Sequence, residues 1–180
     1  MRSCVYARWL RGHGVCAIPL EIEAMKSSES LVRERVLREV VALVERGLPD
    51  EALKLLKSAN GADPVLLNAA GVCHLRAGRP DRAVEVFRRL CVGEGIGMRP
   101  DVSQLHAANF ATALLLSGNL NACRHHLRFV EPSHPVAVQV GAAIAKWERS
   151  LGRWRQLMLR LGLWDPKRPI ELDSPAGVIA

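Results

Sequence analysis

The chain has 180 residues, of which 49% are apolar and 24% charged, so it is a globular protein rather than a disordered polyelectrolyte. A chain of this length is one domain or a small pair and buries roughly 70% of the surface that its unfolded form exposes. No apolar run approaches the ~20 residues of a membrane-spanning helix. The formal net charge is +7, but most basic residues are arginines spread along the chain, which is only a weak indication of nucleic-acid binding.

Residues 1–28 form a leader that precedes the first strong helical periodicity. Arg2, Arg8 and Arg11 give it the charge of a targeting peptide, but arginines interrupt its apolar run and no small-x-small cleavage site stands out. Three interpretations stay open: a disordered segment upstream of a translation start at Met25, a weakly packed extra segment, or a targeting segment.

Apolar spacing, prolines at helix starts and glycines at helix ends predict an all-helical chain. No strand pattern competes with the helical one. The expected helices lie near residues 29–46, 50–59, 64–77, 80–91, 101–117, 120–130, 134–151 and 152–162.

Two stretches of this pattern repeat each other. Residues 44–57 match residues 75–88 at an offset of 31, and weaker copies surround Gly118 and Gly152. In each copy a helix ends near a glycine that can adopt a left-handed conformation, and a new helix begins one or two residues later. A small residue in the second helix lets the two helices approach closely. The repeat therefore predicts three to four antiparallel helical hairpins. The matched pairs are Gly47 and Gly78, Pro49 and Pro80, Asp50 and Asp81, Ala52 and Ala83, and Leu56 and Phe87.

Over residues 29–162 these copies resemble tetratricopeptide repeats. Leu67 and His74 replace the family's Trp and Tyr in the best copy. The resemblance implies a short right-handed α-solenoid of three to four hairpins, while helix pairs of another solenoid family are the alternative. It is carried by Gly71, Gly78, Ala83 and Phe87, with Pro64 and Pro135 near the closing positions.

Residues 163–180 form a C-terminal tail that contains three prolines, so it cannot be helical and is expected to be extended. Trp164, Ile170 and Leu172 are apolar residues that can anchor it on the helices. We expect the tail to lie along the array, in its concave groove, as an intramolecular occupant.

The resemblance implies a non-enzymatic protein–protein interaction module, such as a scaffold, adaptor or assembly chaperone. A rigid array of hairpins suits a peptide or a partner helix on its concave face. Asn109 takes the place of an asparagine that some family members use to bind a peptide backbone or a terminal carboxylate. The family's full basic clamp is absent, because Leu116 and Ser150 stand at corresponding positions. The family register places Leu37, Val41, Asn68, Val72, Arg76, Asn109, Thr112 and Lys146 on or near the groove.

The alternative is an accessory protein that associates with an anionic membrane surface or with nucleic acid. Residues 146–168 carry seven basic side chains against Glu148 and Asp165, and this stretch also contains tryptophans at helical spacing. The same apolar stripe would equally cover the end of a repeat array. Either way, an acidic partner is expected at this end, on a basic C-terminal patch of Arg149, Arg153, Arg155 and Arg160.

Five cysteines at irregular spacings, without a CxxC pair, indicate neither a disulfide framework nor a zinc ribbon, so a reducing, cytoplasmic setting is expected. Cys73 and Cys123 fall in apolar helical patterns, where cysteine acts as a small hydrophobe. His125 and His126 cannot face one ion together with Cys123, because neighbouring side chains on a helix diverge by about 100°. We therefore expect no bound metal, no cofactor and no catalytic residues.

Overall fold

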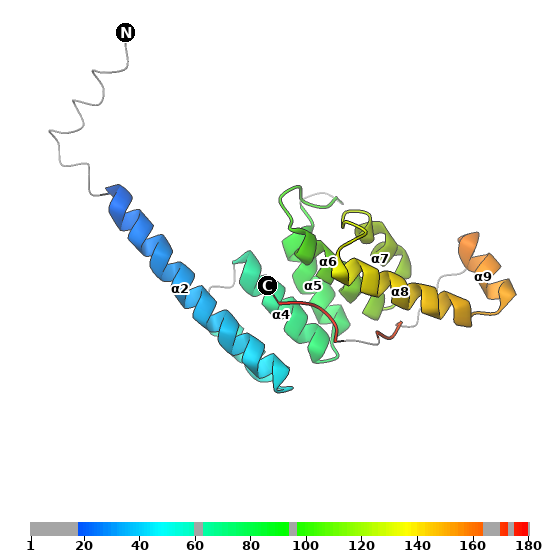
Figure 1. The fold of residues 1–180 in the computed structure, drawn as a ribbon, viewed down its shortest axis with the longest axis horizontal. Helices are drawn as coiled ribbons and strands as arrows, with labels where there is room; N and C mark the ends of the chain where they lie inside the picture. Colours follow the sequence, from blue (N-terminus) through cyan, green and yellow to red (C-terminus); the bar gives the residue numbers. More distant parts are fainter. Residues whose placement is uncertain (1–17, 60–62, 94–96, 164–169, 173–174, 180) are drawn as a thin grey trace, which may run out of the picture. The chain divides into compact units, whose positions relative to one another are not determined.

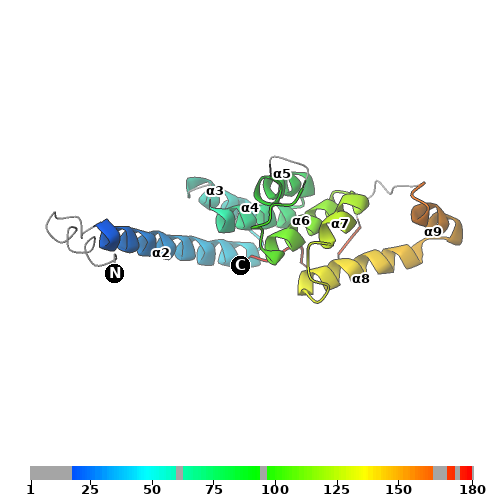
Figure 2. The ribbon, with the colours of Figure 1, turned by 90° about the horizontal axis from the view of Figure 1, so that it is seen from above.

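A computed structural model of the chain describes residues 18–59, 63–93, 97–163, 170–172 and 175–179, with side chains from residue 30 onward. The chain divides into two compact units, Met1–Arg38 and Glu39–Ala180. In the described ranges the secondary structure is helical, apart from one isolated β-bridge between Val92 and Met98. The described helices, labelled in Figure 1 except for α3, which is labelled in Figure 2, are α2 (Ile18–Glu45), α3 (Pro49–Ser58), α4 (Pro64–Arg76), α5 (Pro80–Cys91), α6 (Gln104–Leu116), α7 (Leu120–Leu127), α8 (Pro135–Ser150) and α9 (Arg153–Arg160).

The all-α fold class is confirmed, and the helices predicted from residue 50 onward begin and end within three residues of the observed ones. The first helix differs, because it starts at Ile18 rather than near residue 29. Residues 18–28, which the sequence assigned to the leader, therefore lie in α2. The rest of that leader, residues 1–17, lies outside the described residues.

Three helix ends share one turn geometry, at Gly47, Gly78 and Gly118, whose φ angles are 75°, 69° and 82°. At the second of them, the Gly78 N–H donates to the Leu75 carbonyl (3.0 Å) and the Arg79 N–H donates to the His74 carbonyl (2.9 Å). Such paired bonds satisfy the last carbonyls of a helix, and glycine enters the left-handed region without a steric penalty. The glycines of the first three repeat copies thus end helices as predicted.

In the fourth copy the break between two helices falls where it was predicted, but the left-handed glycine does not. Gly152 has a φ of −63° and forms the N-cap of α9, whereas the left-handed glycine of this region is Gly162, with a φ of 69°. The extended Leu151 has already ended α8. The Gln156 side chain then donates to the carbonyls of Glu148 (3.0 Å) and Leu151 (2.9 Å), which satisfies the end of α8 without a glycine turn.

The core of the second unit lies around α6. Helix α6 packs on α5, α7, α8 and α4, and α4 also packs on α3 and α5; Figure 2 shows α6 and α7 side by side. Every residue of α6 from His106 to Leu115 is buried. Helices α4 and α5 approach closely at Gly71, where an added Cβ would lie 2.4 Å from the Cζ atom of Phe87. This glycine therefore lets a fully buried aromatic ring lie directly against the helix backbone.

Three partly or fully buried histidines border this core: His74, His106 and His126. Burial lowers the pKa of each below its ordinary value of about 6.5, and the charges of nearby arginines add to the effect at His74. The His126 ring lies 4.6 Å from the Phe110 ring, centroid to centroid. Because a neutral imidazole fits these places better than a charged one, protonation favours the unfolded chain.

We expect the free energy of unfolding to fall as the pH drops from 7.5 to 5.5. The contribution of each neutral histidine is complete above its unfolded-state pKa of about 6.5, and at pH 5.5 the loss is at most about 1.4 kcal/mol per histidine. Urea unfolding at several pH values measures this loss. The variant His126→Phe should show a smaller loss over this pH range. If the variant kept the pH dependence of the unaltered chain, burial of neutral His126 would not be a cause of that dependence.

Candidate functional site

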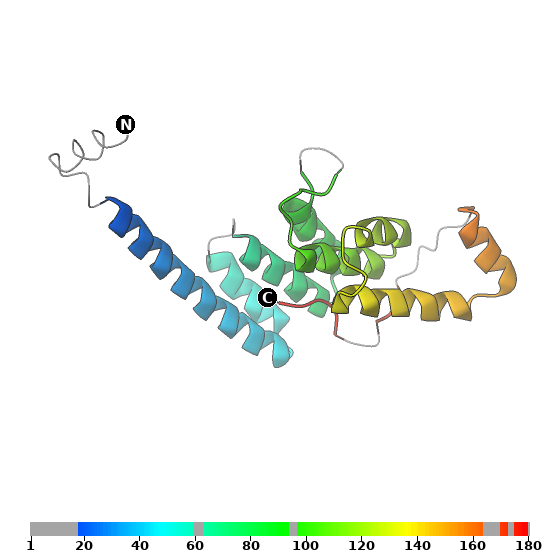
Figure 3. The same ribbon diagram turned by 45° about the horizontal axis from the view of Figure 1, so that its top comes forward.

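The C-terminal tail folds back onto the helices. Ile170 is buried in the core of the second unit, and Leu172, Ala176 and Ile179 pack against that core. In Figures 1 and 3 the red end of the chain lies beside α4. The prediction that Ile170 and Leu172 anchor the tail is confirmed, while Trp164 lies outside the described residues.

Two buried asparagines hold the backbone of Val178. The Asn109 Nδ2 donates to the Val178 carbonyl (2.8 Å), and the Val178 N–H donates to the Asn109 Oδ1 (3.0 Å). The side-chain amide thus pairs with a main-chain residue as a neighbouring β-strand would. The Asn68 Nδ2 donates to the same carbonyl (3.3 Å), and the Asn109 Nδ2 also donates to the Asn68 Oδ1 (2.8 Å). Both asparagines are inaccessible to solvent, so these bonds replace the hydrogen bonds to water that their side chains lose on burial.

Arg76 holds the two residues that precede Val178. Its Nε donates to the Ala176 carbonyl (2.8 Å), and its Nη2 donates to the Gly177 carbonyl (3.2 Å). Asn68, Val72 and Arg76 are spaced by four residues on α4, which places them on one face of that helix. The charged donor therefore continues the line of polar contacts that the asparagines begin.

Gly177 sits where no other residue fits well. Its φ is +77°, and an added Cβ would lie 3.1 Å from Val72 Cγ2 and 3.3 Å from Leu75 Cδ1. A side chain here would meet both an unfavourable backbone conformation and a tight contact. We call the five residues that contact positions 176–178 (Asn68, Val72, Leu75, Arg76 and Asn109) the tail site.

An unfilled cavity of about 220 Å³ borders the tail site. The tail forms one side of it, and the end of α2 forms another. The tail therefore leaves space beside its own side chains. The cavity is lined by Val41, Val44, Glu45, Val72, Arg76 and residues 177–179.

The structure brings together four of the residues that the sequence placed on the groove, namely Asn68, Val72, Arg76 and Asn109, and Val41 lines the adjoining cavity. The other three lie elsewhere. Thr112 is buried, and its hydroxyl donates to the Ala108 carbonyl of its own helix (2.9 Å). Leu37 is half-buried in the N-terminal unit, and Lys146 is exposed on α8.

Sequence reasoning missed two residues of the contact. Leu75 fell within the helix expected over 64–77 but had no assigned role, and Gly177 was not singled out. A glycine between apolar residues, shortly after a proline and outside any helix, was the available signal for Gly177. The sequence around Leu75 gives no such signal, because the contact of Leu75 depends on where the distant tail lies.

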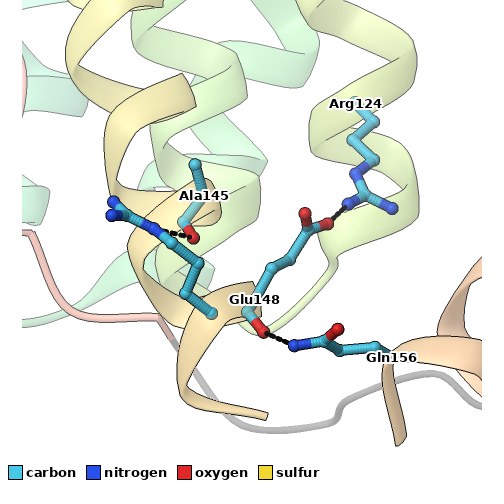
Figure 4. Close-up of polar contacts among 5 residues, drawn as sticks. Arg124, Ala145, Glu148 and Gln156 are labelled. Carbon is cyan, nitrogen blue, oxygen red and sulfur yellow. Dashed lines mark hydrogen bonds and ion pairs between the residues drawn. The ribbon is translucent and has the colours of Figure 1, made fainter. Parts of the chain in front are cut away.

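A second cavity, of about 360 Å³, lies among α7, α8 and α9. Figure 4 shows the Arg124–Glu148 ion pair, and the Arg149 Nε donates to the Ala145 carbonyl (3.2 Å). Arg149 and Arg160 of the predicted basic patch line this cavity, whereas Arg153 and Arg155 are exposed outside its lining. The lining thus holds three arginines and one carboxylate, Glu148, which pairs with Arg124. Both partners of this ion pair are partly exposed, so salt screens it.

The buried cysteines have little nucleophilic character. Burial raises the pKa of Cys73 to about 11 and the pKa values of Cys91 and Cys123 to about 12. These thiols stay protonated at neutral pH, and the thiolate is the form that reacts. The described part of the chain holds no group of three His, Cys, Asp or Glu side chains placed to hold a metal ion. None of its helices combines the length and apolarity that a membrane crossing requires.

Comparison of the chain with protein-family models, with curated proteins and with solved structures finds no match.

Proposed function

We propose that this chain is a non-enzymatic interaction module, a scaffold, adaptor or assembly chaperone, that binds an extended peptide segment of a partner protein at the tail site. The observation that carries this proposal is the paired hydrogen bonding between the Asn109 side chain and the Val178 backbone. An amide that pairs with both main-chain groups of one residue recognises extended backbone whatever side chain that residue carries.

We propose further that the hairpins form a short right-handed solenoid of the tetratricopeptide type. The left-handed glycines that end three helices and the contact of Gly71 with Phe87 support this. So does the packing of α4, α6 and α8 as successive neighbours. In such an array the first helices of the hairpins line a common surface, and Asn68, Arg76 and Asn109 belong to α4 and α6.

The test is selection of a displayed peptide library on the immobilised full-length chain, followed by affinity measurements on the selected peptides. In a Gly177→Val chain, whose tail no longer competes for the site, Asn109→Ala and Arg76→Ala should each weaken their binding about fivefold or more, because a hydrogen bond to a buried partner or a charged donor is worth about 1–3 kcal/mol. Asn119→Ala and Arg88→Ala, on exposed positions of the same unit, are the matched controls. Peptides that bind all four variants equally would refute the proposal.

The alternative, an accessory protein at an anionic surface, predicts a different result. Binding would then go to acidic vesicles or nucleic acid, would collapse between low and moderate salt, and would be lost on substitution of Arg149 and Arg160 rather than Asn109.

A further inference from the structure

We infer that the tail is an internal competitor for the tail site, and that its sequence defines the class of segment that the site binds. That class is an extended peptide with a glycine, then any residue except proline, then an aliphatic residue, as in Gly177, Val178 and Ile179. This inference rests on the proposed function and adds the identity of the ligand and a means of regulation.

The requirement for glycine comes from α4. Gly177 is buried against Val72 and Leu75, where a Cβ atom would make a tight contact at 3.1–3.3 Å, and its φ of +77° disfavours other residues. Arg76 meanwhile binds the carbonyls of Ala176 and Gly177, which every peptide offers. The helix thus selects a glycine by shape and fixes the register of the segment by hydrogen bonds.

The next two positions differ in what they require. The Val178 N–H donates to Asn109, so a proline there would remove a bond, but the Val178 side chain is 46% exposed and is free to vary. The Ile179 side chain is half-buried and packs against the core, which favours an aliphatic residue. The site therefore restricts the residue type at two positions, the glycine and the aliphatic residue that follows two positions later.

Two features make the tail a ligand that a partner can replace. Its contacts at the site are mostly hydrogen bonds from side chains to its backbone, which another extended segment would make equally well. The tail also leaves the adjoining cavity of about 220 Å³ unfilled, so a partner with a larger side chain gains contacts that the tail lacks. A tethered segment acts at a local concentration in the millimolar range, which sets the affinity that a partner must exceed.

The experiment uses the full-length chain and a fluorescent peptide with the sequence of residues 170–180. Gly177→Val in the chain should release the tail, because a β-branched residue is strained at this φ and collides with Val72. By fluorescence anisotropy, the released chain should bind the peptide at least about tenfold more tightly than the unaltered chain does. Val178→Pro, which removes the N–H that Asn109 binds, is a second way to release the tail. Thermal unfolding checks that both variants fold.

The controls come from the same segment. Val178→Ala in the chain leaves the backbone bonds in place and should keep the weak binding of the unaltered chain. A peptide with alanine in place of its glycine should lose at least about tenfold in affinity for the released chain. Equal binding by released and unaltered chains, or equal binding of the glycine and alanine peptides, would overturn the inference. Library peptides that depend on Asn109 but lack the glycine would overturn it too, yet leave the proposed function standing.

Discussion

Replacing Phe87 by alanine is expected to lower the free energy of unfolding by about 3–5 kcal/mol, the range observed when a buried aromatic ring is removed from a core. The Phe87 side chain is fully buried, and its ring lies against Gly71 of the neighbouring helix. Removing it leaves a cavity between α4 and α5 that rigid helices fill only in part. Since domains are stable by about 5–15 kcal/mol, the variant should lose a large part of its stability in urea unfolding.

Phe129→Ala is the matched control, because the Phe129 side chain is 47% exposed. It should cost less than about 1 kcal/mol. A cost at Phe87 no greater than that at Phe129 would contradict the packing described for α4 and α5.

Gly71 should couple to Phe87. An alanine at position 71 would place its Cβ inside the contact distance of the ring, and such overpacking costs about 1–3 kcal/mol. The same change should cost less in a Phe87→Leu background, where the obstructing ring is gone. A double-mutant cycle in urea measures this coupling, and additive effects would show that the two residues do not meet.

The helix ends could be predicted because their signals are local. Gly47, Gly78 and Gly118 end helices by their own conformational freedom, and Pro49 and Pro80 begin the next ones without help from distant residues. The pattern fails where two equal signals compete. A leucine precedes both Gly152 and Gly162, and the left-handed turn falls at the second. At the first, the Gln156 side chain satisfies the carbonyls of Glu148 and Leu151 instead.

The start of α2 could not be predicted, because the sequence carries no signal for it. Prediction from periodicity depends on a stripe of apolar residues that packing will bury. Residues 18–28 mix apolar, acidic and small polar residues without such a stripe, so their helix had no signal of that kind.

Half of the residues that the sequence assigned to a groove lie together at the tail site, and three of them follow from the four-residue spacing on α4. Once Asn68 is on a helix, Val72 and Arg76 follow on the same face, and the repeat register adds Asn109 from α6. Gly177 is different, because its partner helix lies about a hundred residues earlier in the chain. No local pattern encodes which backbone position of the tail meets the asparagines. This docking register is a tertiary property, set by the buried anchor Ile170 and by the space that Gly177 requires.

Asn109→Asp should have the second large effect, although the two side chains have nearly the same shape. Asn109 donates to two carbonyl oxygens, those of Val178 and of the Asn68 side chain. A carboxylate donates to neither and brings a charge into a place that solvent does not reach. Burying such a charge without an opposite charge beside it costs about 3–5 kcal/mol. We expect a loss in this range at pH 7.5, together with release of the tail.

The pH dependence of that loss distinguishes charge from shape. Burial raises the pKa of the new carboxyl group in the folded chain above its unfolded value of about 3.9. The extra cost relative to the unaltered chain is therefore small below that value and grows as the pH rises through the folded-state pKa. Urea unfolding of both chains at matched pH measures it, and hydrogen exchange of the Val178 amide reports the tail. Asn119→Asp is the matched control, since its side chain caps α7 by accepting the Ala122 N–H, which a carboxylate does equally well. If Asn109→Asp kept both its stability and the protection of Val178, the paired hydrogen bonds would not hold the tail, and the backbone recognition proposed for this site would lose its basis.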